Sequence, residues 1–240
     1  MKNAFKILFY EDGEPIDPRC IRRFVYAFPK GYQKVVRTII ENSVRIDEET
    51  FKYNVATLMK SFKMTRKGAF YGVRVDKRGI AEDPEKVIDT CWTNVGGKLQ
   101  RLQQYLNENR SGKRGRAVVN IALNSRIHVI EKTSEIFEEL LQITLNHGEI
   151  SPVAASKILF AILPEVALPV DTAEWKYVFE TDSYRNILST MIDEIEAWEK
   201  NYDIQLESLD PYPKATLPEI YNVMAMVARP HVQYLQPRRR

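Results

Sequence analysis

The sequence contains little cysteine and histidine, which limits the kinds of site that it can build. Cys20 and Cys91 are the two cysteines among 240 residues, and the three histidines, His128, His147 and His231, lie far apart. A disulfide framework and a cysteine-rich zinc site are therefore excluded, and we expect no metal site. With so few cysteines, a reducing cytoplasm is the expected location.

Long apolar runs and ready-made catalytic motifs are also missing. No run approaches the roughly 18 to 20 apolar residues that span a bilayer, so we expect no membrane partner. The first residues, Met1 to Lys6, lack the apolar stretch of a secretory signal. There is no Gly-rich phosphate-binding loop, dinucleotide fingerprint, Gly-x-Ser-x-Gly motif or His-Glu-x-x-His motif, and we therefore expect no cofactor.

The excess of positive charge is small, but it is unevenly distributed. Lys and Arg number 35 against 32 Asp and Glu, which gives a net charge of +3 and a pI near 8.7. Basic residues gather at 60–67, 110–116 and 238–240. A patchy basic surface of this kind suits phosphates, and we expect Lys113, Arg114 and Arg116 to contact DNA. The alternative is that the loop 110–116 is exposed to solvent and binds no partner.

The spacing of apolar residues predicts a mainly α protein. Helical periodicity covers 18–44 with a break near 29–31, and then 47–62, 83–107, 134–146, 151–163, 171–179, 183–202 and 216–228. Extended segments at 5–9 and 68–75 predict a minor N-terminal strand and a small β-ribbon. We expect one multi-helix globular domain over 1–240. Alternatively, this domain consists of two lobes, about 1–116 and 117–240, with a DNA-binding cleft between them.

Capping signals predict where several helices begin. Asp83-Pro84 and Ser151-Pro152 each combine a capping side chain with proline at the first helical position. The segments Asp171 to Glu174 and Thr216 to Glu219 fit capping boxes. The pair Gly96-Gly97 predicts a kink in the helix that contains it.

The stretch from Leu145 to Thr172 is the most informative part of the sequence. It contains Asn146-His147-Gly148-Glu149-Ile150-Ser151-Pro152, then a small-residue helix with one lysine, and then Pro169-Val170-Asp171-Thr172. This order of helix, short turn, helix, extended linker and capped helix resembles the helix-hairpin-helix superfamily of DNA glycosylases over about residues 132–180. The resemblance implies a helical domain that binds double-stranded DNA.

The same resemblance implies roles for individual residues. Gly148 and Ser151 stand in the hairpin, which in that family grips a DNA phosphate, although the family has two glycines there. Lys157 is similar to the lysine that can attack the sugar. Asp171 is similar to the aspartate of a Val-Asp motif that faces the flipped nucleotide. Lys157 precedes Asp171 by 14 residues, several fewer than is usual in the family.

The chemistry of base excision suits these residue types. Breaking the bond between C1′ and the base builds positive charge on the sugar, and a carboxylate such as Asp171 stabilises that charge. The N-terminus of a helix keeps such a carboxylate ionised. If Lys157 is desolvated and reaches the sugar, it is a nucleophile that forms a Schiff base. If it lies about a turn too far along its helix to reach the sugar, water is the nucleophile. Trp175 is a candidate for stacking on the displaced base.

Each of these residues also has a purely structural interpretation. Asp171 matches an ordinary N-cap, Lys157 can extend its amine to solvent, and Trp175 can be part of the core. The leading hypothesis is a DNA glycosylase-like enzyme that flips and excises a damaged or modified base, in repair or in defence against modified foreign DNA. The alternatives are a non-catalytic helical nucleic-acid-binding protein and a helical protein-interaction module.

Overall fold

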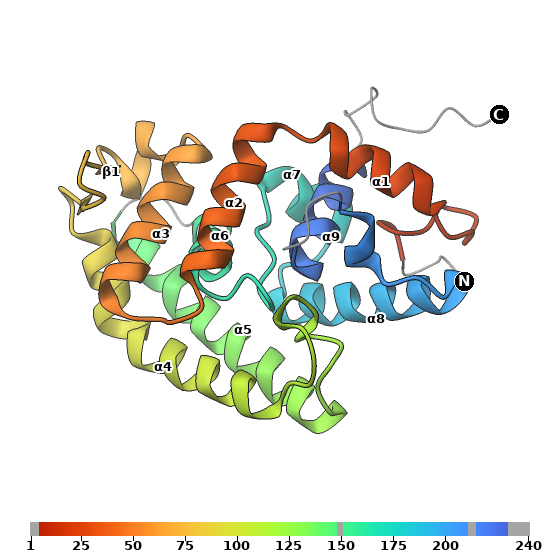
Figure 1. Cartoon of the computed structure of the whole chain (residues 1–240). Helices are drawn as coiled ribbons and strands as arrows, with labels where there is room; N and C mark the ends of the chain where they lie inside the picture. The colour runs from red at the N-terminus through yellow and green to blue at the C-terminus, as the bar shows by residue number, and fades with distance from the viewer. Residues whose placement is uncertain (1–4, 148–150, 211–214, 230–240) are drawn as a thin grey trace.

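The structure is a computed structural model that describes residues 5–147, 151–210 and 215–229. It confirms the mainly α prediction (Figure 1). The helices are α1 (Pro18–Ala27), α2 (Lys30–Asn42), α3 (Glu48–Ser61), α4 (Val87–Asn109), α5 (Leu123–Asn146), α6 (Pro152–Ile162), α7 (Thr172–Glu174), α8 (Tyr184–Tyr202) and α9 (Leu217–Val227). Two short strands, β1 (Arg74–Val75) and β2 (Ala81–Glu82), pair antiparallel. No helix among the described residues is long and apolar enough to cross a membrane.

Helix α6 is the central element of the fold. All of its residues from Ala154 to Ile162 are buried, because α2, α3 and α5 all pack against it. Helix α4 runs along α5, and α1, α8 and α9 gather at the other end of the molecule (Figure 1). Both halves of the chain contribute residues to one hydrophobic core.

Side-chain caps fix the starts of several helices, and two of these caps, Ser151 and Thr216, are predicted from the sequence. A hydroxyl or carboxylate oxygen accepts a hydrogen bond from a backbone N–H of the first turn, which otherwise has no partner within the helix. This contact is made by Asp17 in α1, Asp47 in α3, Ser151 in α6, Ser183 in α8 and Thr216 in α9.

Two predicted helix starts are wrong by a turn or more. Helix α4 begins at Val87 and not after Asp83, because Lys86 adopts a left-handed conformation with φ of 55°. The Asp83 carboxylate still serves this helix, since it accepts a 2.7 Å hydrogen bond from the Ile88 N–H. Helix α5 begins at Leu123, eleven residues before the predicted start at 134.

The extended segments are also shorter than the sequence predicts. The N-terminal strand is reduced to one bridge between Phe9 and Pro15. The segment that begins at Gly68 first forms a 3₁₀ turn, Gly68–Phe70, and only then enters β1. The ribbon is thus a small hairpin packed on α3.

Helix α4 passes through Gly96 and Gly97 as one continuous helix, where the sequence predicts a kink. The reason for glycine at position 96 is a close contact with a side chain. A Cβ atom at Gly96 would lie 2.7 Å from the Trp92 ring, so the ring occupies the space that any larger residue needs. At Gly97, the nearest atom to such a Cβ is the flexible Arg101 Nη1 at 3.6 Å.

We expect Gly96→Ala to destabilise the protein by about 1 to 3 kcal/mol, because the added methyl group forces the Trp92 ring to move. Gly97→Ala is the matched control and should stabilise the protein by about 0.5 to 1 kcal/mol through helix propensity. Unfolding in urea measures both changes. Two variants of equal stability would contradict the packing of Trp92 on Gly96.

Candidate functional site

An extended segment carries the chain from α6 to α7 and is fastened at two points. The Ser156 hydroxyl accepts a 3.1 Å hydrogen bond from the Val170 N–H and donates to the Val170 carbonyl. The Tyr184 hydroxyl donates to the Leu168 carbonyl at 2.9 Å and accepts from the Leu168 N–H. These contacts hold the end of the segment beside α6, so the next residue, Asp171, lies next to Lys157.

Four charged side chains form a network at this point, which we call the ion cluster: Lys157, Asp171, Glu174 and Arg229. The Lys157 amine donates to Asp171 Oδ1, and Arg229 Nη2 donates to Asp171 Oδ2 at 2.9 Å. Arg229 Nε also donates to Glu174 Oε1 at 2.8 Å. The Asp171 N–H donates to Glu174 Oε2 at 2.7 Å, which closes the network.

Burial differs strongly within the ion cluster. Lys157 is 3% exposed and Glu174 is 1% exposed, whereas 32% of the Asp171 side chain is open to solvent. Asp171 is therefore the carboxylate of the cluster that a bound molecule can reach. The structure brings together the two residues that the sequence singles out as catalytic candidates.

The charges of the cluster set the protonation states. Burial lowers the pKa of Lys157, although the Asp171 charge opposes this effect. Burial acts to raise the pKa of Asp171, but Lys157 and Arg229 outweigh it and hold this pKa below its usual value. Burial raises the pKa of Glu174, with Arg229 acting in the opposite direction. At neutral pH Asp171 is therefore an anion, and it lies between the Lys157 amine and the Arg229 guanidinium.

Aromatic rings form the wall next to the buried amine. The Phe62 ring centroid lies 3.9 Å from Lys157 Nζ, a cation–π contact that partly replaces lost hydration. Tyr32 packs edge-on against Phe62 with ring centroids 5.6 Å apart, and Phe28 packs on Tyr32 at 5.0 Å. Phe62 caps the end of α3, Tyr32 lies in the first turn of α2, and Phe28 caps the end of α1, so the ion cluster lies next to these three helix ends.

Trp175, the candidate for base stacking, packs against the core. Its ring lies 5.9 Å from Phe137 and 6.2 Å from Tyr184, and those two rings are stacked on each other at 4.4 Å. The indole Nε1 is buried and has no hydrogen-bond partner in the described structure. Stacking of Trp175 on a base stays a prediction.

Two arginines that the sequence assigns to DNA are instead ion-paired within the protein. Arg114 donates to Glu165 at 2.8 Å and to the carbonyls at the end of α2. Arg116 is 8% exposed and contacts Glu199 at 2.7 Å as well as Glu207. The partners lie far away in the sequence, and a basic run does not reveal them. Both guanidinium groups therefore have carboxylate partners within the protein, and their contact with phosphate stays a prediction.

The remaining predicted DNA contacts are Lys113, Ser151 and Gly148. Lys113 is exposed, beside the two ion-paired arginines. The Ser151 hydroxyl accepts a 3.0 Å hydrogen bond from the Ala154 N–H and so caps α6. Gly148 lies outside the described residues. Phosphate binding by the hairpin stays a prediction.

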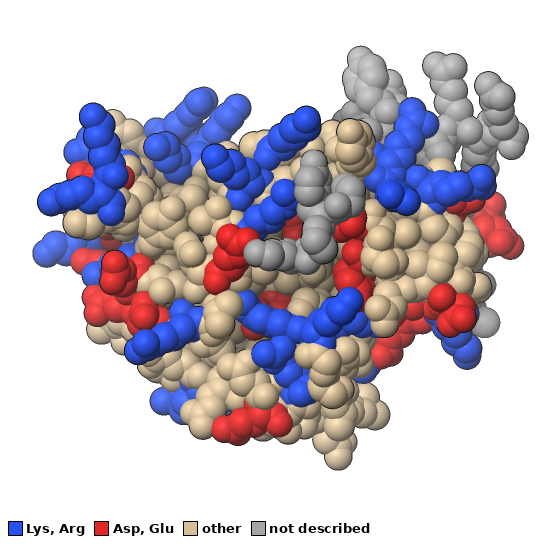
Figure 2. Space-filling model, in the orientation of Figure 1, with Lys and Arg blue, Asp and Glu red and all other residues tan. Residues whose placement is uncertain are grey.

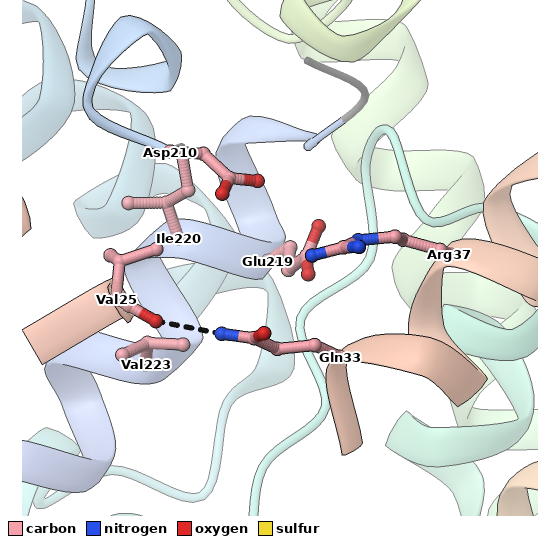
Figure 3. A pocket seen from close by; sticks show the side chains of 7 residues that line it. All are labelled: Val25, Gln33, Arg37, Asp210, Glu219, Ile220 and Val223. Atoms are coloured by element: carbon pink, nitrogen blue, oxygen red, sulfur yellow. Dashed lines mark hydrogen bonds between the residues drawn. The ribbon is translucent and has the colours of Figure 1, made fainter. Parts of the chain in front are cut away.

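A small pocket lies between α1, α2 and α9 (Figure 3). Glu219 is 6% exposed and its Oε2 atom accepts no hydrogen bond within the part of the chain that the structure describes. Burial is the main reason that the pKa of Glu219 is raised to about 8, and the nearby charge of Asp210 adds to the increase. The Arg37 guanidinium lies beside this carboxyl group, and Gln33 donates to the Val25 carbonyl at 2.7 Å (Figure 3).

Sequence reasoning missed Arg229 and the role of Glu174 in the ion cluster. Glu174 was visible as the last residue of a capping box, which explains its bond to the Asp171 N–H but not its bond to Arg229. Arg229 is 58 residues from Asp171, and no local spacing signals such a contact. Among the described residues there is no group of three His, Cys, Asp or Glu side chains that could bind a metal ion.

Comparisons with protein-family models, with curated proteins and with solved structures find no match to this chain.

The Glu219 carboxyl group should make stability depend on pH. Its pKa is about 8 in the folded chain against 4.5 as the ordinary value, so folding favours the protonated form. The stability that this group contributes is complete below its unfolded pKa and is lost as the pH rises through its folded pKa. In Glu219→Gln, the free energy of unfolding should therefore fall less between about pH 5 and about pH 8.5 than in the unaltered protein.

Unfolding in urea at a series of pH values measures this effect. Glu85→Gln is the matched control, because Glu85 is exposed, and it should keep the pH profile of the unaltered protein. A Glu219→Gln profile identical to that of the control would contradict the burial of an ionisable carboxyl group in this pocket.

Proposed function

We propose that this protein is a DNA glycosylase-like enzyme that removes a damaged or modified base from duplex DNA. The observation that supports the proposal most is the contact between Asp171 and Lys157 at the start of α7, where the carboxylate is ionised and partly open to solvent. The sequence nominates the same two residues for this chemistry. A helical body with a reactive carboxylate near its surface fits an enzyme of this class.

The proposed reaction is hydrolysis of the bond between C1′ and the base. As this bond breaks, its electron pair leaves with the base and positive charge develops on the sugar. The Asp171 carboxylate stabilises that charge and orients the attacking water. The water oxygen bonds to C1′, and its two protons are divided between the sugar hydroxyl and the departing base. The product is an intact strand with an abasic site.

Lys157 acts mainly as a positioning residue in this proposal. Its amine is buried, is bound to Asp171 and lies over the Phe62 ring, so a sugar carbon has no direct approach to it. Lys157 and Arg229 together fix both oxygens of Asp171 and keep its pKa low. Water is accordingly the favoured nucleophile, and no Schiff base is expected.

A second candidate function is a nucleic-acid-binding protein without catalysis. The specific observation in its favour is that each Asp171 oxygen already accepts a hydrogen bond from a cation. In this second candidate the carboxylate has only a structural role, in which it connects α6, α7 and Arg229, two residues after α9. Release of a base from DNA separates the two candidates.

Asp171→Asn should lower the rate of base release at least about 100-fold, because the amide cannot stabilise positive charge on the sugar. Affinity for duplex DNA should change by less than about twofold, since the shape of the side chain is kept. Single-turnover release from duplexes that carry alkylated, oxidised or deaminated bases measures the rate. Asp182→Asn, at an exposed position near α7, is the matched control and should act as the unaltered protein does.

Two further results bear on the proposal. Reduction with borohydride should trap no covalent adduct between the protein and DNA, because water is the nucleophile. An adduct that disappears in Lys157→Ala would show that the lysine attacks the sugar while leaving the glycosylase assignment in place. DNA binding without release of any base from these substrates would contradict the assignment and favour the non-catalytic candidate.

A further inference from the structure

Several exposed cations of the described structure make no ion pair, and six of them belong to α1, α2 and the end of α3. Helix α1 contributes Arg22 and Arg23, the start of α2 contributes Lys30 and Lys34, and the end of α3 contributes Lys60 and Lys63. We call these six residues the basic face. Many other surface cations are paired with a carboxylate, as Lys52, Arg74 and Lys132 are.

The three elements of the basic face lie along the same side of the molecule. In Figure 1, α1, the start of α2 and the end of α3 follow the upper edge. Figure 2 shows Lys and Arg side chains gathered along this edge with few acidic side chains between them. Unpaired cations on one side repel one another, so such a surface is suited to an anionic partner.

The basic face borders the candidate site. Lys60 and Lys63 flank Phe62, whose ring lies 3.9 Å from the Lys157 amine. Lys30 and Lys34 flank Tyr32, whose ring packs against Phe62. These four cations are within two residues of the rings beside the buried lysine in the sequence, so an anionic polymer bound to the basic face would lie close to the candidate site.

We propose that the basic face binds the phosphate backbone of duplex DNA and brings it to Asp171. This inference rests on the proposed function, and it moves the DNA contacts from the loop 110–116 to α1, α2 and α3. On α1, the spacing of Arg22, Arg23 and Tyr26 places their side chains on one helix face. Tyr26 is 65% exposed and can pack against a sugar of the backbone while the arginines contact phosphates.

The same helix argues against an anionic membrane as the partner. A helix that lies on a bilayer inserts an apolar face between the lipid headgroups. The apolar residues of α1, namely Ile21, Phe24 and Val25, are buried in the protein core. The basic face thus offers charge and a tyrosine but no apolar stripe, which fits a phosphodiester backbone better than a bilayer.

The test compares two triple variants with the same change of charge. The basic-face variant is Arg22→Gln/Lys34→Gln/Lys60→Gln, with one substitution in each helix. The control variant is Lys86→Gln/Arg101→Gln/Lys200→Gln, at exposed cations just before α4, on α4 and on α8. Affinity for a short undamaged duplex is measured by fluorescence anisotropy over a series of salt concentrations, after thermal unfolding has shown that both variants are folded.

The basic-face variant should bind DNA about 10- to 100-fold more weakly at moderate salt, and the slope of log K against log [salt] should decrease by about 0.9 for each lost phosphate contact. The control variant should keep the affinity and the slope of the unaltered protein. Equal weakening in the two variants would overturn the inference, because it would reflect net charge alone. Binding to phosphatidylserine vesicles without binding to the duplex would also overturn it.

Failure of this inference is distinguishable from failure of the proposed function. Because the duplex carries no damaged base, the binding result does not depend on catalysis. If the unaltered protein releases bases and the basic-face variant binds DNA normally, the surface assignment is wrong and the enzyme assignment stands. If the variant loses DNA binding and no base is ever released, the surface assignment stands and the enzyme assignment is wrong.

Discussion

The burial of one lysine charge in the central helix is the constraint on which the candidate site depends. Helix α6 is surrounded by α2, α3 and α5, and Lys157 is the one charged residue between Pro152 and Ile162. A buried ammonium group costs several kcal/mol unless a carboxylate and further contacts compensate for it. Asp171 supplies that carboxylate, so the segment after α6 has to return to the helix and place the start of α7 beside it.

Compensation of buried charge also explains other long-range contacts of the fold. Arg229 balances Glu174 and Asp171 and so connects the residues after α9 to α7. Arg114 joins the end of α2 to Glu165, and Arg116 joins α8 to the segment after it. Such pairs stabilise the fold little compared with apolar contacts, but loss of one partner leaves an uncompensated charge. The charged groups that remain unpaired on the surface are therefore the ones available to a partner.

The helices could be predicted from the sequence, because apolar periodicity and side-chain caps are local signals. The starts of α6 and α9, for example, follow from Ser151 and Thr216. The start of α4 could not be predicted, since it depends on a left-handed Lys86. The partners of Arg114 and Arg116 are 51 and 83 residues away, and no spacing indicates them. That Lys157 and Asp171 belong to one site was expected only through a family resemblance, their ion pair was not predicted, and Arg229 had no signal at all.

The central claim is that Lys157 and Asp171 act as one coupled unit, and a double-mutant cycle tests it most directly. Lys157→Met, Asp171→Asn and the double variant are compared with the unaltered protein by the free energy of unfolding. Asp171→Asn leaves the buried Lys157 amine without its carboxylate, whereas Lys157→Met leaves Asp171 paired with Arg229. Because the charge of one residue depends on the other, the account predicts a coupling energy of at least about 1 kcal/mol. Effects that add to within about 0.5 kcal/mol would mean that the two side chains are independent and would contradict the account.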